Sequence, residues 1–172
     1  KAIGTGSGEG YYLVQKGDSL FEIAGREDVY GNPLKWPSLF RLNMDRLGTI
    51  ETADGFEHKD LPEGLKLKFV TPSQARENLS KLGRNVWVVS VISTQDPKKV
   101  VSPAIALMKC GCRVYITKAT VNGKEWMRLR VGFYENRTEA GSAMENIASM
   151  PDAEDAWVTR IGQKELKEFG GY

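Results

Sequence analysis

The sequence predicts an α+β protein made of two small domains. Its 172 residues are enough for one ordinary domain or for two small ones. Two separate segments, residues 11–70 and 86–162, each combine the alternating apolar residues of strands with the apolar spacing of helices. The polar stretch between them, residues 71–85, is predicted to be a linker that could be partly helical.

The ends of the chain and its composition set limits on this division. Residues 1–10 are rich in glycine and predict a flexible segment, and residues 163–172 are expected to form a C-terminal tail. The formal charge of +2 gives no reason to expect a nucleic acid or an anionic membrane as partner. No stretch approaches the roughly 18 consecutive apolar residues that span a bilayer. Because the chain begins at Lys1 without a methionine or a signal peptide, we expect a processed or excised fragment.

The first domain begins with a strand, a sharp turn and a capped helix. Tyr12 and Val14 alternate as on a half-buried strand. Gly17 permits the turn, and Asp18 or Ser19 can cap the start of the helix. The apolar face of that helix is predicted to contain Leu20, Ile23 and Ala24.

A second helix and a closing strand complete the first domain. Pro37 suits the first turn of a helix, and we expect Trp36 and Phe40 on the same side of it, in the core. The apolar residues of the closing strand alternate with lysines, and they are Leu65, Leu67 and Phe69.

The second domain predicts the order β-α-β-β-α-β. The expected elements are a strand at 86–93, a helix from Ser102-Pro103 to Gly111, strands at 112–119 and 125–131, a helix from Asn136 and a strand at 156–161. The Asn122-Gly123 pair between two of these strands is a strong hairpin signal. This order predicts a four-stranded antiparallel sheet with both helices on one face, a ferredoxin-like sandwich.

The strand at 125–131 has two faces of different chemistry. Its apolar residues, Met127, Leu129 and Val131, must face the two helices. The other face then lies open and joins residues of neighbouring strands; the set is Ser90, Tyr115, Thr117, Trp126, Arg128 and Arg130. Such a face suits a sugar polymer, because aromatic rings stack on sugar rings and guanidinium groups donate to sugar oxygens. The alternative is a solvated face whose arginines pair with acids.

The first domain resembles the lysin motif (LysM), a small module that binds glycans containing N-acetylglucosamine. Residues 12–24 carry the pattern Tyr-x-Val-x-x-Gly-Asp-Ser-Leu-x-x-Ile-Ala, residues 36–43 carry Trp-x-x-Leu-x-x-x-Asn, and residues 62–67 carry Pro-x-Gly-x-x-Leu. The resemblance implies a β-α-α-β fold with a shallow glycan groove between two loops. The implied contacts are Gly17, Asp18, Ser19, Leu20, Leu61 and Pro62.

Two features qualify this site. Capping alone would explain Asp18 and Ser19, and a place in the core is the favoured interpretation for Leu20. Residues 44–60 are longer than the corresponding family loop, which forms one wall of the groove, so that wall could differ here.

The second domain resembles the sporulation-related repeat (SPOR) domain. The pattern Glu-Trp-Met-Arg-Leu-Arg-Val-Gly-Phe-Tyr-x-x-Arg-x-x-Ala at residues 125–140 carries the resemblance, which extends over about residues 85–161. SPOR domains bind bacterial septal peptidoglycan, especially glycan strands stripped of stem peptides. Ser90 stands where the family usually has Gln, and Phe133 where it usually has Pro, so one typical polar contact differs.

Both resemblances imply one function, a non-enzymatic protein of the bacterial periplasm or cell envelope that holds peptidoglycan glycan strands. Other envelope or cell-division proteins are further expected partners. One alternative is a protein–protein adaptor that docks partners through residues 44–60 or the open sheet. Another is an RNA-recognition module of the same strand order. The low net charge and a first strand with only Val88, Ser90 and Ile92 on the open face disfavour this.

The sequence carries no catalytic, cofactor or metal-binding motif. There is no nucleophile elbow and no Cys-His pair, so we expect no enzymatic activity, no cofactor and no metal. Cys110 and Cys112 flank Gly111, and the single histidine, His58, is distant in sequence. A disulfide across one residue would be strained, and the alternative is two small thiols at the end of a helix.

Overall fold

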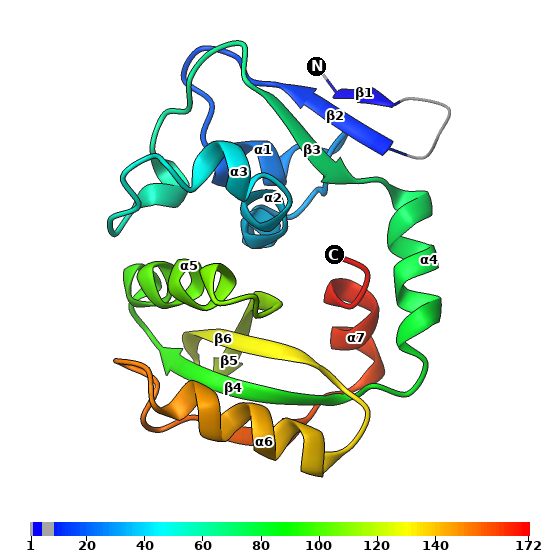
Figure 1. The fold of residues 1–172 in the computed structure, drawn as a ribbon, viewed down its shortest axis with the longest axis vertical. Coiled ribbons are helices and arrows are strands. Elements are labelled where there is room, and N and C mark those ends of the chain that lie inside the picture. The colour runs from blue at the N-terminus through cyan, green and yellow to red at the C-terminus, as the bar shows by residue number, and fades with distance from the viewer. Residues whose placement is uncertain (1, 5–8) are drawn as a thin grey trace.

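The computed structural model describes residues 2–4 and 9–172, and its two halves are joined by one helix (Figure 1). We call the part before residue 71 the first half and the part after residue 85 the second half. Both halves contain helices and an antiparallel sheet, which confirms the α+β class. No helix in the described ranges has the length and apolarity to cross a membrane.

The first half is a small sheet covered by short helices. Its strands are β1 (Ala2–Gly4), β2 (Glu9–Leu13) and β3 (Lys66–Val70), paired in that order. Its helices are α1 (Leu20–Gly25), α2 (Trp36–Leu42) and α3 (Met44–Leu47), with 3₁₀ turns η1 (Pro33–Lys35) and η2 (Phe56–His58). The flexible segment expected at residues 1–10 is corrected in part, because residues 2–4 form a strand and residues 9 and 10 belong to another. Residues 1 and 5–8 lie outside the described ranges.

Tyr12 and Leu67 face each other across β2 and β3, and both are fully buried. Trp36 and Phe40 of α2 lie in the same core, as the sequence predicted. The buried Asn43 joins the end of α2 to β3, because its amide donates to the Lys68 carbonyl at 2.9 Å and accepts from the Lys68 N–H at 2.8 Å. These bonds satisfy backbone groups at the edge of the sheet.

The second half has the predicted four-stranded antiparallel sheet. Its strands are β4 (Trp87–Thr94), β5 (Val114–Val121), β6 (Lys124–Tyr134) and β7 (Trp157–Arg160), in the spatial order β5-β6-β4-β7. Its helices are α5 (Val101–Lys109), α6 (Arg137–Ala148) and α7 (Gln163–Phe169), with the 3₁₀ turn η3 (Pro97–Val100). Asn122 and Gly123 both have positive φ and close the hairpin between β5 and β6, as predicted.

One face of this sheet packs against α5 and α6. The buried residues of that face include Val89, Val91, Ile116, Leu129 and Val131, in one cluster with Leu107 of α5 and Ile147 of α6. Met127, Leu129 and Val131 therefore face the helices, as their alternation predicted.

The segments expected to be a partly helical linker and a C-terminal tail each contain a helix. The linker region contains α4 (Pro72–Leu82), which begins with a capping box between Thr71 and Gln74. The expected C-terminal tail contains α7. Leu79 and Leu82 of α4 pack against the cluster that Leu166 and Phe169 of α7 form on the second face of the sheet.

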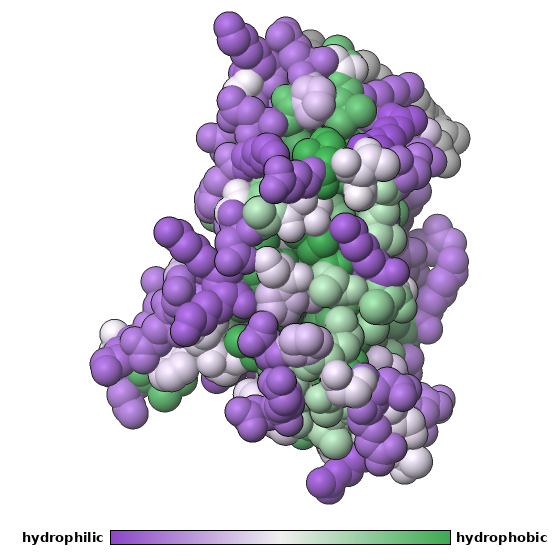
Figure 2. All heavy atoms as spheres, turned by 60° about the vertical axis from the view of Figure 1, so that its left-hand side comes forward, coloured by the Kyte–Doolittle hydropathy of each residue, from purple (hydrophilic) through white to green (hydrophobic). Residues whose placement is uncertain are grey.

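The two halves share one apolar core. Helix α2 contacts both β5 and α5, and buried residues of both halves belong to a single cluster. In Figure 2, hydrophobic residues gather along the middle of the visible surface, over both halves, with hydrophilic residues around them. Polar contacts add to this interface: Ser102 of α5 bonds to Asp54, and Lys109 donates to Thr52 at 3.4 Å. The long loop of residues 44–60 therefore contacts α5 of the second half.

The last residues tie three parts of the chain together. Arg113 donates to the carbonyls of Gly170 at 2.6 Å and Tyr172 at 2.7 Å, and Asn78 of α4 donates to Gly171 at 3.0 Å. The Tyr172 ring packs edge-on against Tyr30 of the first half, with ring centres 5.2 Å apart. A Cβ on Gly171 would lie 2.4 Å from the Ala75 carbonyl oxygen, so only glycine fits there.

Candidate functional site

The predicted binding face is the side of the second sheet that points away from α5 and α6. Strand register places its residues in rows across β5, β6 and β4. Tyr115, Arg130 and Ser90 form one row, and Thr117, Arg128 and Ser93 form the next. Trp126 lies one step further along β6 and pairs with Ala119.

Helix α7 covers the first of these rows. The Tyr115 hydroxyl donates to Glu165 Oε1 of α7 at 2.7 Å, and the Arg130 guanidinium forms an ion pair with the same oxygen. The Phe169 ring stacks on Tyr115 with ring centres 5.0 Å apart. Burial and the Glu165 carboxylate raise the pKa of Tyr115 above its ordinary range.

The prediction that no helix covers this face is therefore wrong for Ser90, Tyr115 and Arg130, which are all buried. The missed signal is the pair Leu166 and Phe169, whose spacing gives residues 163–169 an apolar helical side. Beneath α7, Ser90 Oγ and Arg130 Nε have no hydrogen-bond partner among the described residues.

A bulge in β4 changes which residues reach this face. Ile92 pairs with Leu129 and packs against the core, whereas simple alternation placed Ile92 on the open face beside Ser90. Ser93 takes that place and lies opposite Arg128. One extra residue in a strand reverses the direction of those that follow, which a period-two pattern does not reveal.

Beyond α7, one part of the face stays accessible, and we call it the open strip: Ser93, Thr117, Trp126, Arg128 and Trp157. Trp126 and Arg128 are half-buried, and Trp157 is 41% exposed. Among the described residues, the side chains of Trp126 and Arg128 have no hydrogen bond, and Arg128 has no ion pair. The strip can thus offer indole faces and unengaged guanidinium donors to a ligand.

In the first half, Asp18 and Ser19 are engaged in the turn before α1. Asp18 Oδ2 accepts from the Tyr12 hydroxyl at 2.6 Å and from the Gln15 N–H at 2.8 Å. Ser19 Oγ caps the helix by accepting from the Glu22 N–H at 3.3 Å. Burial, followed by the hydrogen bond to Asp18, raises the pKa of Tyr12 to about 12.

The two loops of the predicted first-half groove lie together, because the Leu61 N–H donates to the Asp18 carbonyl at 2.8 Å. Leu20 and Leu61 are buried, so their side chains contribute to the core. Gly17, with φ of +84°, and Pro62 are exposed. Ligand contacts in this groove would therefore come from Gly17, Pro62 and backbone groups around them.

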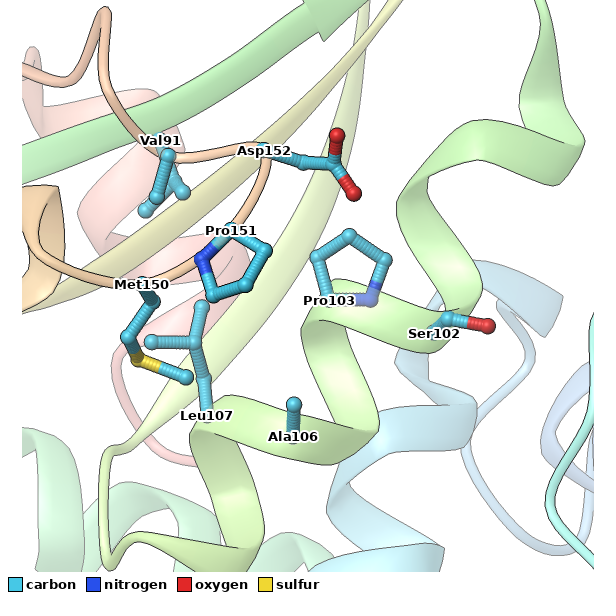
Figure 3. Close-up of a pocket in the computed structure, with 9 residues that line it drawn as sticks. Val91, Ser102, Pro103, Ala106, Leu107, Met150, Pro151 and Asp152 are labelled. Carbon is cyan, nitrogen blue, oxygen red and sulfur yellow. The ribbon is translucent and has the colours of Figure 1, made fainter.

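A cavity of about 170 Å³ lies between α5 and the loop after α6 (Figure 3). Pro103 and Leu107 of α5 face Met150 and Pro151 across it. The lining is mostly apolar, and its polar residues are Asp152 and Ser102, which bonds to Asp54 of the first half. Asp152 could accept hydrogen bonds from hydroxyl groups, but the lining has no aromatic ring on which a sugar could stack.

Cys110 lies exposed at the end of α5, Cys112 is partly buried, and both are free thiols. Burial raises the pKa of Cys112, which lowers its thiolate fraction near neutral pH. Among the described residues, no group of three or more His, Cys, Asp or Glu side chains could hold a metal ion.

Comparison of the chain with protein-family models, with curated proteins and with solved structures finds no match. The two family resemblances therefore depend on the sequence patterns alone.

Proposed function

We propose that this chain is a non-enzymatic peptidoglycan-binding protein of the bacterial periplasm or cell envelope. It would hold glycan strands through a SPOR-like second half and a LysM-like first half. The observation that carries the proposal is the open strip, where Trp126 lies beside Arg128, whose guanidinium has no partner among the described residues. Trp157 extends the strip across β4, opposite Ser90.

The chemistry of the strip matches that of an amino-sugar strand. Pyranose rings present C–H groups on their faces, and these pack on an indole ring. Acetamido and lactyl oxygens lie around the ring edges and accept hydrogen bonds from a guanidinium fork. An arginine already paired with an acid would lose that pairing on binding, whereas Arg128 has no such partner within the described chain.

The first half would add a second, weaker contact through the backbone around Gly17 and Pro62. Two weak sites on one polymer give avidity only when both can be engaged together. Here α4 and the shared core fix the relative position of the halves, so no flexible linker needs to be ordered on binding.

Sedimentation with purified cell walls treated with an amidase, which removes stem peptides, tests the proposal. We expect the wild type to sediment with the walls, and the double variant Trp126→Ala, Arg128→Ala to stay in solution. Arg84→Ala is the matched control, because Arg84 is exposed and lies outside the strip. Failure of the wild type to sediment, or equal sedimentation of the double variant, would contradict the proposal.

The alternative, a protein–protein adaptor, drew on the length of the loop at residues 44–60. That loop directs Thr52 and Asp54 to α5 of the same chain. These contacts give the loop a structural task, so its length no longer favours an external partner.

A further inference from the structure

The cavity between α5 and the loop after α6 is apolar inside and opens to solvent (Figure 3). Its walls include Val91 and Leu107, which are almost fully buried, whereas Ala106 and Pro151 at its rim are exposed. A protein cavity of about 150 Å³ is known to hold one benzene molecule. The volume of about 170 Å³ is therefore enough for one short hydrocarbon group, such as a branched aliphatic side chain.

Asp152 lies at the rim and is the one charged residue that lines this cavity within the described ranges. It is exposed, and its carboxylate has neither a hydrogen bond nor an ion pair with any described residue. Its φ of +65° is a left-handed backbone conformation that few residues other than glycine adopt. Figure 3 shows the carboxylate extending over the cavity toward Pro103. It is therefore accessible to a ligand that donates hydrogen bonds.

A second carboxylate adds negative charge to the rim. Asp54 accepts a hydrogen bond from Ser102, which lines the cavity, and Asp54 has no ion pair among the described residues. An anionic ligand would therefore be repelled, and a purely apolar ligand would cover Asp152 without replacing the water that it loses. The complementary ligand carries a cation beside its hydrocarbon group, because the carboxylate lies at the mouth and the apolar walls lie deeper.

We propose that this cavity binds the amino terminus of a peptide whose first residue has an aliphatic side chain, such as leucine. The side chain lies between Pro103 and Pro151, against Leu107, and the α-ammonium donates to the Asp152 carboxylate. In such a residue the ammonium and the side chain leave the same carbon atom, which matches a carboxylate directly beside an apolar hollow. A lysine side chain fits less well, because its ammonium is at the far end and would enter the apolar interior. The open rim leaves the rest of the peptide in solvent.

This site is independent of the proposed glycan function. The cavity lies on the side of the sheet that packs against α5 and α6, whereas Arg128 and Thr117 point to the opposite side. Variants in the cavity therefore leave the open strip unchanged, and we expect them to sediment with cell walls like the wild type. Wall binding and peptide binding can thus fail separately.

The test titrates the full chain with the tripeptide amide Leu-Gly-Gly, and NMR follows the methyl signal of Met150, which lines the cavity. The chain has five methionines, and the variant Met150→Leu assigns the signal. We expect saturable shifts in the millimolar range. The acetylated peptide lacks the positive charge and should bind about fivefold more weakly, which is what an exposed ion pair supplies. Gly-Gly-Gly amide lacks the side chain and should bind at least about tenfold more weakly.

Three variants locate the binding. Asp152→Asn keeps the shape of the side chain and removes its charge, and we expect it to weaken binding of Leu-Gly-Gly amide about fivefold. Asp155→Asn, in the same loop and exposed but outside the cavity lining, is the matched control and should bind like the wild type. Ala106→Phe adds a ring at the exposed rim, and it should abolish binding while the melting temperature stays close to that of the wild type.

Several results would overturn the proposal. They are no saturable shift of the Met150 signal, equal binding of the acetylated peptide, unchanged binding by Asp152→Asn, and an equal loss in Asp155→Asn. A further probe, 3-methylbutylammonium, has the same hydrocarbon group and ammonium as leucine without a peptide backbone. If it binds as tightly as Leu-Gly-Gly amide, the backbone contributes nothing and the assignment to a peptide is wrong.

Discussion

The two predicted binding regions differ in what their polar side chains do. The side-chain oxygens of Asp18 and Ser19 accept hydrogen bonds in the turn before α1, whereas the side chains of Trp126 and Arg128 have no hydrogen bond within the described chain. The sheet of the second half shows the same contrast between engaged and unengaged side chains. Arg130 forms an ion pair with Glu165 of α7, whereas Arg128, one row further along β6, has no ion pair among the described residues. A polar residue that matches a family's sequence pattern is thus a candidate ligand contact only when its side chain has no partner within the fold.

Removing Glu165 should have the largest effect. Glu165→Ala leaves Arg130 buried without its partner and removes the acceptor of the Tyr115 hydroxyl, so we expect a loss of about 3 kcal/mol in the free energy of unfolding. Urea denaturation measures it. Lys167→Ala, on the same helix but exposed, is the control. A loss of stability no larger than that of the control would mean that the contacts of Glu165 with Tyr115 and Arg130 do not stabilise the fold.

Asp18→Ala tests the structural task of the first region. It removes the acceptor of both the buried Tyr12 hydroxyl and the Gln15 N–H, and we expect it to destabilise the protein by about 2 kcal/mol. Wall binding per folded molecule should stay unchanged. Normal stability together with lost wall binding would instead assign Asp18 to the ligand.

High pH should lower the free energy of unfolding through the Tyr12 hydroxyl, which donates to Asp18 in the same turn. The pKa of Tyr12 is raised from its ordinary value to about 12, so its neutral form is favoured in the folded state. The resulting stability is present below pH 10 and lost as the pH rises through 12, with about 1.4 kcal/mol lost by pH 11. Urea denaturation from pH 9 to 11 measures the loss. Tyr12→Phe should show a smaller decline over this range, and an equal decline would exclude Tyr12 as its source.

Ser19→Ala should cost about 1 kcal/mol, because the Glu22 N–H at the start of α1 loses its acceptor. Ser19→Asp, which can cap in the same way, should restore most of that loss. Thermal unfolding followed by circular dichroism separates the variants. Identical melting of Ser19→Ala and the wild type would show that the cap adds nothing.

Arg128→Ala should have the smallest effect on stability, within about 0.5 kcal/mol, because the guanidinium has no partner to lose among the described residues. Wall binding should fall nevertheless. A clear destabilisation would show that Arg128 serves the fold, and the contrast between the two regions would disappear.

Local patterns in the sequence predicted much of this fold. The alternation of Met127, Leu129 and Val131 indicated the core side of β6, and Asn122-Gly123 indicated the hairpin. The bulge in β4 could not be predicted, because it depends on how Ile92 packs rather than on its residue type. Helix α7 was within reach, since Leu166 and Phe169 already have helical spacing.

The candidate sites followed from the sequence less completely. Strand direction alone placed Trp126 and Arg128 on one face, but what covers that face depends on a segment thirty or more residues away. For the same reason, the sequence could not show that Glu57 and Met127, which belong to different halves, line one cavity.

The core that the two halves share has a practical consequence for experiments that express each half separately. Helix α2 lies against β5 and α5, so a cut after residue 70 would expose to water the apolar side chains that now lie between the halves. Each isolated fragment would expose an apolar surface, and the cut would separate Tyr30 in the first fragment from Tyr172 in the second. The function of either half is therefore best tested with point variants of the full chain rather than with separated halves.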